Sequence, residues 1–245
     1  MMLTVTILLP AFFAGLIVLA THVPLGQEVL RRGIIFLDLA IAQIAGLGAI
    51  IAASRGFSPL WVQGLALFFA FAGSLVLAFM GKRYPAIFEA LIGSSFILAA
   101  SAGILFLAAN PHGAEHLQDL LAGQILWVQS QELIWAFLIS ACILLVWFAK
   151  KPANHGFYLL FAPAVMVSVQ LVGVYLVFAS LIFPALAAKN KTIPLLWGYG
   201  TGIVGFALGL ALSFFLDLPA GPLCCWLLAA TAVGASFYRR SNGRI

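Results

Sequence analysis

The segment GFYLLFAPAVMVSVQLVGVYLVFASLIFPALAA, residues 156–188, decides the fold of this chain. It contains no charged residue, and it is longer than the roughly 20 residues that one upright transmembrane helix needs. Pro163 and Gly173 lie inside it, and both residue types interrupt regular helices. We therefore expect two short passes that turn near Gly173. Irregular backbone at membrane depth is tolerated only where it is buried in protein or lines a cavity, so this turn is expected to do one or the other.

Apolar runs also fill most of the remaining sequence. The chain is 64% hydrophobic and 8% charged, with a mean hydropathy of +1.15, whereas soluble domains carry about 25% charged residues. The other runs lie at about 3–21, 33–53, 59–80, 86–109, 131–149, 193–216 and 220–238. The sequence predicts an all-α polytopic membrane protein with about eight to nine transmembrane helices, in which residues 1–245 form a single transmembrane domain.

The loops between the runs predict how the helices are oriented. With the N-terminus outside and the turn near Gly173 included, every basic cluster falls on the cytoplasmic side, as the positive-inside bias requires. These clusters are Arg31/Arg32, Lys82/Arg83, Lys150/Lys151, Lys189/Lys191 and Arg239/Arg240/Arg244, and only Arg55 falls outside. We expect a multi-pass protein of a bacterial cytoplasmic membrane with a cytoplasmic C-terminus. Residues 1–6 carry no positive charge and no small-residue cleavage site follows the first run, so we expect that run to be a retained span.

Two further patterns concern partners and packing. The net charge of +5 comes from scattered basic residues rather than from a basic stripe, so no nucleic-acid partner is expected. Cys142, Cys224 and Cys225 all lie in apolar stretches, which favours packed thiols over a disulfide framework. The spacings Gly198-x3-Gly202 and Gly205-x3-Gly209 allow helix backbones to approach closely, either within one bundle or at a homodimer seam.

The run at 33–53 carries polar side chains in an apolar setting. It contains the carboxylate of Asp38 and the amide of Gln43. An ionisable group inside a membrane span is costly unless it faces protein or water, so Asp38 is a candidate functional residue.

A polar loop at residues 110–131, NPHGAEHLQDLLAGQILWVQSQ, is a second candidate. It brings imidazoles and carboxylates together at helical spacing, a ligand set that suits Zn²⁺ or Mn²⁺. The residues are His112, Glu115, His116 and Asp119. The loop is interpreted either as an outer capture site for metal or as a solvated capping turn. HGAEH also matches the H-x-x-E-H pattern of a class of zinc peptidases, which leaves a membrane-bound zinc hydrolase as an alternative. A short loop supplies neither a third ligand nor a substrate cleft for that reaction.

Five segments, in order along the chain, resemble the permeases of zinc/manganese/iron-type ATP-binding-cassette importers. The segments are PLGQEVLRR (24–32), EALIGSSFILAASAGILFL (89–107), DLLAGQILWVQSQEL (119–133), VGVYLVFASLIFPALAA (172–188) and LSFFLDLPAGP (212–222). The resemblance implies a homodimeric permease related in fold to cobalamin and siderophore permeases, embedded in lipid, with no permanently bound cofactor. It also implies a separate cytoplasmic ATPase that binds ATP, an extracytoplasmic substrate-binding protein and a divalent metal ion as cargo. Consistent with a separate motor, the chain has no G-x-x-x-x-G-K-[ST] phosphate loop.

The chain departs from the family pattern at two places. The family's second helix typically carries Gly-Asp-x-Leu-x-His, whereas here the Asp position is Leu39 and the His position is Gln43, with Asp38 displaced by one. An amide is a poorer Zn²⁺ ligand than imidazole, so a weak, partly hydrated transit site is expected. A metal chelate or an organic cofactor is the alternative cargo. We expect Asp38, Gln43 and Glu89 to line the path.

The second departure is the segment expected to couple to the ATPase, which is shortened to Lys150–Gly156. Other turns at the cytoplasmic side are then expected to share in docking. The residues expected to dock the ATPase are Glu28, Arg31, Arg32, Lys150, Lys151, Lys189 and Lys191.

Overall fold

The structure, a computed structural model, describes residues 2–107, 125–150 and 155–242. Each of the eight predicted apolar runs forms helix, and the long run at 156–188 forms two helices. The helices are α1 (Met2–Arg32), α2 (Leu37–Ser54), α3 (Pro59–Arg83), α4 (Phe88–Leu107), α6 (Ser130–Lys150), α7 (His155–Val172), α8 (Val174–Ala188), α9 (Pro194–Leu216) and α10 (Ala220–Asn242). The described part of the chain contains no strand, so the all-α prediction is confirmed.

The predicted break at Gly173 is present. Among the described residues, seven helices are each long and apolar enough to cross a membrane, and α7 with α8 pass the same test as a pair bent by 120°. Gly173 joins the pair with a φ of 79°, a left-handed conformation that glycine adopts without a steric cost. The two helices have 18 and 15 residues, or about 27 and 22 Å, so each is shorter than the hydrocarbon core of about 30 Å.

Proline and glycine set several other helix boundaries. Pro59 and Pro194 stand in the first turns of α3 and α9, where a missing N–H leaves no helical hydrogen bond unmade. Gly33 and Gly56 follow α1 and α2 with φ of 70° and 72°, a conformation that ends a helix. These residues explain why long apolar runs separate into distinct helices.

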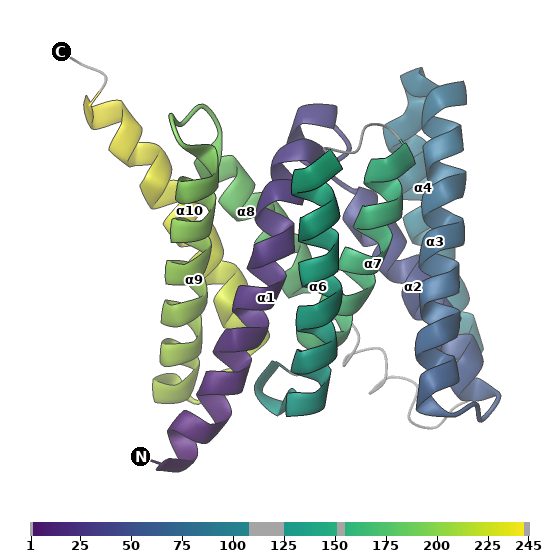
Figure 1. Ribbon diagram of the computed structural model, residues 1–245, viewed down its shortest axis with the longest axis horizontal. Coiled ribbons are helices and arrows are strands. Elements are labelled where there is room, and N and C mark those ends of the chain that lie inside the picture. Colours follow the sequence, from purple (N-terminus) through teal and green to yellow (C-terminus); the bar gives the residue numbers. More distant parts are fainter. Residues whose placement is uncertain (1, 108–124, 151–154, 243–245) are drawn as a thin grey trace.

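The ends that carry the basic clusters lie together. Helices α1, α3, α6, α8 and α10 all end at the upper edge of the bundle in Figure 1, whereas the N-terminus and the end of α2 lie at the lower edge. Arg55, which caps α2, is therefore at the opposite end from the other basic residues. This arrangement agrees with the alternation from which the orientation was predicted. We call the upper edge the basic end.

Exposed tryptophans gather at the opposite end. Trp61, Trp127, Trp135 and Trp226 are all exposed, and each belongs to or lies just before the start of a helix that begins at the lower edge of Figure 1. Tryptophan is enriched where a membrane meets water. The exposed apolar side chains between this belt and the basic end are accordingly a surface suited to lipid.

The glycine spacings of α9 serve packing within the chain. A Cβ added to Gly202 would lie 2.6 Å from Leu19 of α1, and one added to Gly209 would lie 2.6 Å from the backbone of Cys224 in α10. Gly198 and Gly205 are enclosed in the same way. The stripe therefore holds α1, α9 and α10 together. All three cysteines are free thiols.

Candidate functional site

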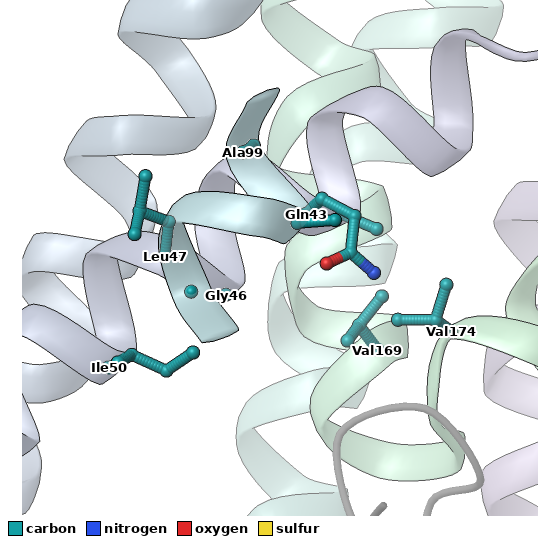
Figure 2. A pocket seen from close by; sticks show the side chains of 10 residues that line it. Gln43, Gly46, Leu47, Ile50, Ala99, Val169 and Val174 are labelled. Carbon is teal, nitrogen blue, oxygen red and sulfur yellow. The ribbon is translucent and has the colours of Figure 1, made fainter. Parts of the chain in front are cut away.

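A pocket lies where the break between α7 and α8 meets α2 and α4. It is lined by Ala42, Gln43, Gly46, Leu47 and Ile50 of α2, Ala99, Ala100 and Gly103 of α4, Val169 of α7 and Val174 of α8. Figure 2 shows the amide of Gln43 directed toward Val169 and Val174. Gln43 is the one polar side chain among these ten residues. The predicted turn in the membrane thus lines a cavity, and Gln43 lies in that cavity.

The backbone at the break shapes the electrostatics of this pocket. The N–H of Gly173 donates to the oxygen of Val169 at 2.8 Å, and its own oxygen accepts from the N–H of Val177 at 3.1 Å. Gly173 caps α8 without a side-chain hydrogen bond. The first N–H groups of a helix have no partner within the helix and carry a partial positive charge. The C-terminal end of α7, which carries the opposite partial charge, lies at the same break. A bare cation here meets one neutral amide and two helix ends whose charges offset each other, so the pocket suits weak binding.

Asp38 does not share the pocket with Gln43. It lies in the first turn of α2, its side chain is buried, and neither carboxylate oxygen has a hydrogen-bond partner among the described residues. Gln43 follows five residues later, so the two side chains stand about 7.5 Å apart along the axis and about 140° apart around it. The structure places Asp38 in protein, between the pocket and the basic end.

Glu89 shares a helix face with the pocket. It is exposed in the first turn of α4, at the basic end of that helix. Ala100, which lines the pocket, follows eleven residues later, and eleven residues make close to three full helical turns. Glu89 therefore lies on the same side of α4 as Ala100, about 16 Å nearer the basic end.

One buried polar group was missed by the sequence reasoning. His22 of α1 is fully buried, and its Nδ1 lies 3.0 Å from both the oxygen of Val18 and the hydroxyl of Thr21. Its Nε2 has no partner among the described residues. His22 falls just beyond the first predicted run, which ends at about residue 21, whereas the structure places it inside α1. An ionisable residue within a membrane helix is uncommon, so a longer first run would have singled it out. His22 is not part of a metal-binding cluster there, since the described residues contain no set of three His, Cys, Asp or Glu side chains that could hold a metal ion.

The predicted outer capture site cannot be compared with the structure. His112, Glu115, His116 and Asp119 lie outside the described residues, as does Lys151 of the docking set.

The remaining docking residues divide into two groups. Arg31, Lys150 and Lys189 are exposed at the basic end. Glu28, Arg32 and Lys191 are instead partly buried by contacts within the chain. Glu28 pairs with both Arg31 and Arg32, and the guanidinium of Arg32 lies 4.4 Å from the centre of the Phe157 ring.

Lys191 links the turn between α8 and α9 to the last helix. Its ammonium donates to the oxygen of Ala235 at 2.8 Å and lies 4.0 Å from the centre of the Trp197 ring. These contacts leave it only partly exposed.

Solved structures share this arrangement of helices. PsaBC from Streptococcus pneumoniae, in complex with a Fab, matches with a TM-score of 0.75 over 92% of this chain and 89% of that chain, at 21% identity. A protein described as a metal-chelate type ABC transporter in an inward-facing conformation matches with a TM-score of 0.71 over 94% of this chain and 85% of that chain, at 18% identity. At these identities the likeness is one of fold.

Sequence relatives and a family model also point to membrane transport proteins. A probable iron transport system membrane protein of Haemophilus influenzae is 31% identical over 51% of this chain, an alignment that spans 56% of the relative's length. An uncharacterized membrane protein of Synechocystis sp. is 26% identical over 86% of this chain and 83% of the relative. The family model of the ABC 3 transport family matches residues 4–154 and 151–239. The zinc hydrolase alternative is dropped, because the chain belongs to the ABC 3 transport family, whose members are membrane subunits of transporters and not enzymes.

Proposed function

We propose that this chain is the membrane-spanning permease of an ATP-binding-cassette importer for divalent metal ions of the zinc or manganese class. The observation that carries the proposal is the pocket in which Gln43, at the family's ligand position, faces the break between α7 and α8. Family membership supports the transport role. The iron-transport name of one relative and the metal-chelate description of another support a metal-containing cargo.

In this proposal the pocket is a transit site rather than a storage site. A transport path needs binding that is favourable enough for entry and weak enough for release. Gln43 offers one neutral oxygen, which suits a cation that keeps most of its water. The ends of α7 and α8 at the break carry opposite partial charges, so together they add little attraction for a bare cation.

The route from the pocket is proposed to follow α4 toward the basic end. Glu89 stands on the same face as Ala100 of the pocket wall and is exposed, so its carboxylate attracts a leaving cation. Asp38 lies at an intermediate depth on α2, and in this proposal it contacts the cargo once the helices rearrange. His112, Glu115, His116 and Asp119 are proposed to capture the ion at the opposite end.

The partners follow from the same arrangement. The basic end faces the cytoplasm, and a separate ATPase docks on exposed residues there, among them Arg31, Lys150 and Lys189. A second copy of the chain completes the path, and an extracytoplasmic binding protein delivers the cargo at the tryptophan-rich end.

A metal chelate is the second candidate cargo. It is favoured by the lining of the pocket, in which no carboxylate or imidazole is present to replace the water of a bare ion. A chelate brings its own ligands, so it needs only shape and a few hydrogen bonds from the protein. The cavity of about 10 Å³ has room for about one water in this conformation, so in this proposal the helices separate before the cargo enters.

The test is uptake into proteoliposomes that hold the permease with its ATPase, with the binding protein outside. ⁵⁴Mn²⁺ and ⁶⁵Zn²⁺ are supplied with and without a chelator. Gln43→Leu is expected to lower uptake about tenfold or more at limiting metal, because a hydrogen bond to a charged group contributes roughly 1.5–3 kcal/mol. Gln63→Leu, on an exposed position of α3, is the matched control and is expected to behave as the wild type.

The outcomes separate the two candidates. ATP-dependent uptake of the free ions supports the first, and uptake of the chelated metal alone supports the second. Full uptake by folded Gln43→Leu protein would remove the pocket from the path.

A further inference from the structure

A junction of three helices lies at the basic end, behind the exposed basic residues. The Nε of Arg32 donates to Glu28 at 2.6 Å, and the guanidinium lies over the ring of Phe157. The side chains of Glu28 and Arg32 are 14% and 19% exposed, whereas that of Arg31 is 72% exposed. Arg31 also bonds Glu28, through its Nε at 2.7 Å, but most of its side chain stays exposed to a partner protein, whereas Arg32 is engaged between α1 and α7.

The ring below Arg32 is fixed on its other sides. Phe157 is fully buried. Its ring centre lies 5.1 Å from that of Phe161 and 6.3 Å from that of Trp147 in α6. We name Glu28, Arg32, Trp147 and Phe157 the Arg32 junction. It ties the end of α1, the end of α6 and the start of α7 to one another.

Helix α7 is also held from a third side. The hydroxyl of Ser74 in α3 donates to the backbone oxygen of Tyr158 at 2.7 Å, and both residues are buried. The start of α7 therefore moves with its neighbours rather than independently of them.

The other end of α7 forms one wall of the pocket. Val169 lies twelve residues after Phe157, about 18 Å along the helix, and it faces Gln43. The chain then turns at Gly173 into α8. Pro163, which was expected to help interrupt this run, lies within α7, and the helix continues through it. A displacement of the start of α7 is therefore carried along the helix to Val169, and the glycine absorbs the change in direction.

We propose that Arg32 is a positioning residue that couples ATPase movement to the pocket, not a docking contact. The inference rests on the proposed function, in which a separate ATPase drives transport. Arg32 suits this role because a guanidinium can stack on a ring while its N–H groups bond a carboxylate, whereas the lysine ammonium is a point charge. Force applied at Arg31 and Lys150 reaches α7 through Arg32 and Phe157.

The proposal predicts opposite defects for two neighbouring arginines that share Glu28. Arg32→Gln is expected to retain the ATPase during purification and to hydrolyse ATP at near the wild-type basal rate. Its uptake of ⁵⁴Mn²⁺ per ATP hydrolysed is expected to fall at least tenfold. Arg31→Gln is expected to lose bound ATPase while keeping that ratio in the complexes that remain. Arg32→Lys, which keeps the cation over the ring, is expected to recover part of the coupling.

A variant in α7 tests the proposal independently of any misfolding of the Arg32 variants. Phe157→Leu keeps an apolar core residue but removes the ring, so it is expected to show the same loss of uptake per ATP. The double variant is expected to be no worse than either single variant, because both changes break one contact.

The assay is run on the purified permease–ATPase complex in proteoliposomes with its binding protein. Coupling that is unchanged in Phe157→Leu, or loss of bound ATPase from Arg32→Gln to the same extent as from Arg31→Gln, would overturn the inference. Absence of ATPase binding or of ATP-dependent uptake in the wild type would overturn the proposed function instead.

Discussion

The contact between α1 and α8 provides the sharpest test of the packing, through Gly26→Ala. A Cβ built on Gly26 would lie 2.1 Å from the backbone oxygen of Leu181 and 3.2 Å from the Cβ of Ala185. Ordinary contact begins at 3.4 Å, so the two helices would have to separate locally by about 1.3 Å, the difference between 3.4 and 2.1 Å. The obstacle is backbone, which cannot rotate away as a side chain can.

The magnitude follows from two opposing effects. Alanine is favoured over glycine inside a helix by about 1 kcal/mol. Overpacking a well-packed interior costs about 1–3 kcal/mol and sometimes more, and a rigid backbone obstacle belongs at the upper end of that range. We expect a net destabilisation of about 1–2 kcal/mol, equivalent to a melting temperature lower by about 2–8 °C for a chain of this size.

Thermal unfolding in detergent, followed by the reaction of a fluorescent dye with the buried Cys224 and the partly buried Cys225, measures this shift. The exposed Cys142 is replaced by serine in all variants, because it would react in the folded protein. Gly64→Ala is the matched control, because Gly64 lies in α3, is exposed, and has nothing within 4 Å of an added Cβ. It is expected to raise the melting temperature slightly. If Gly26→Ala melted at or above the temperature of Gly64→Ala, the close approach of α1 to α8 would be refuted.

Three further predictions concern transport. Asp38→Asn is expected to reduce metal uptake at limiting metal while leaving the amount of folded protein unchanged. The amide keeps the shape of the carboxylate, which has no hydrogen-bond partner among the described residues. Normal uptake would remove Asp38 from the path. The double variant His112→Ala/His116→Ala is expected to raise the metal concentration for half-maximal uptake more than it lowers the maximal rate, because an entrance site contributes affinity and not gating. An unchanged concentration dependence would show that the loop is a solvated turn. A cysteine at Asn190, exposed in the turn between α8 and α9, is expected to crosslink to the co-expressed ATPase in membranes, and crosslinks from Asn154 alone would confine docking to the short segment.

The helices were predictable because the bilayer imposes a length on apolar runs. Each run at or above about 20 residues formed a helix, and only the run too long for one helix was broken, at the glycine identified beforehand. The location of the basic clusters at one end of the bundle followed from counting how often the chain crosses the membrane. These inferences need no tertiary information, since each depends on the local sequence and on the solvent around it.

The pocket was only partly predictable, because its walls come from distant parts of the chain. Gln43 was identified from its position in the second apolar helix, yet Val169 and Val174 lie more than 120 residues later. The turn expected near Gly173 indicated the region of those two valines, but nothing in the apolar run at 156–188 indicated that it would face Gln43. The separation of Asp38 from Gln43, by contrast, was already implied by helical periodicity, since positions five apart do not share a face.

The docking residues show where reasoning from charge stops. Arg31 and Arg32 are adjacent and identical in type, yet one is exposed and the other lies over Phe157, which follows 125 residues after it. Loop charge reports which side of the membrane a turn occupies, because that depends on the whole cluster. Whether a single arginine faces a partner or an aromatic ring depends on which helix packs beside it. The division of the basic end into exposed and partly buried cations is therefore a property of the fold, and the roles proposed for the neighbouring arginines, binding the motor and passing on its movement, depend on it.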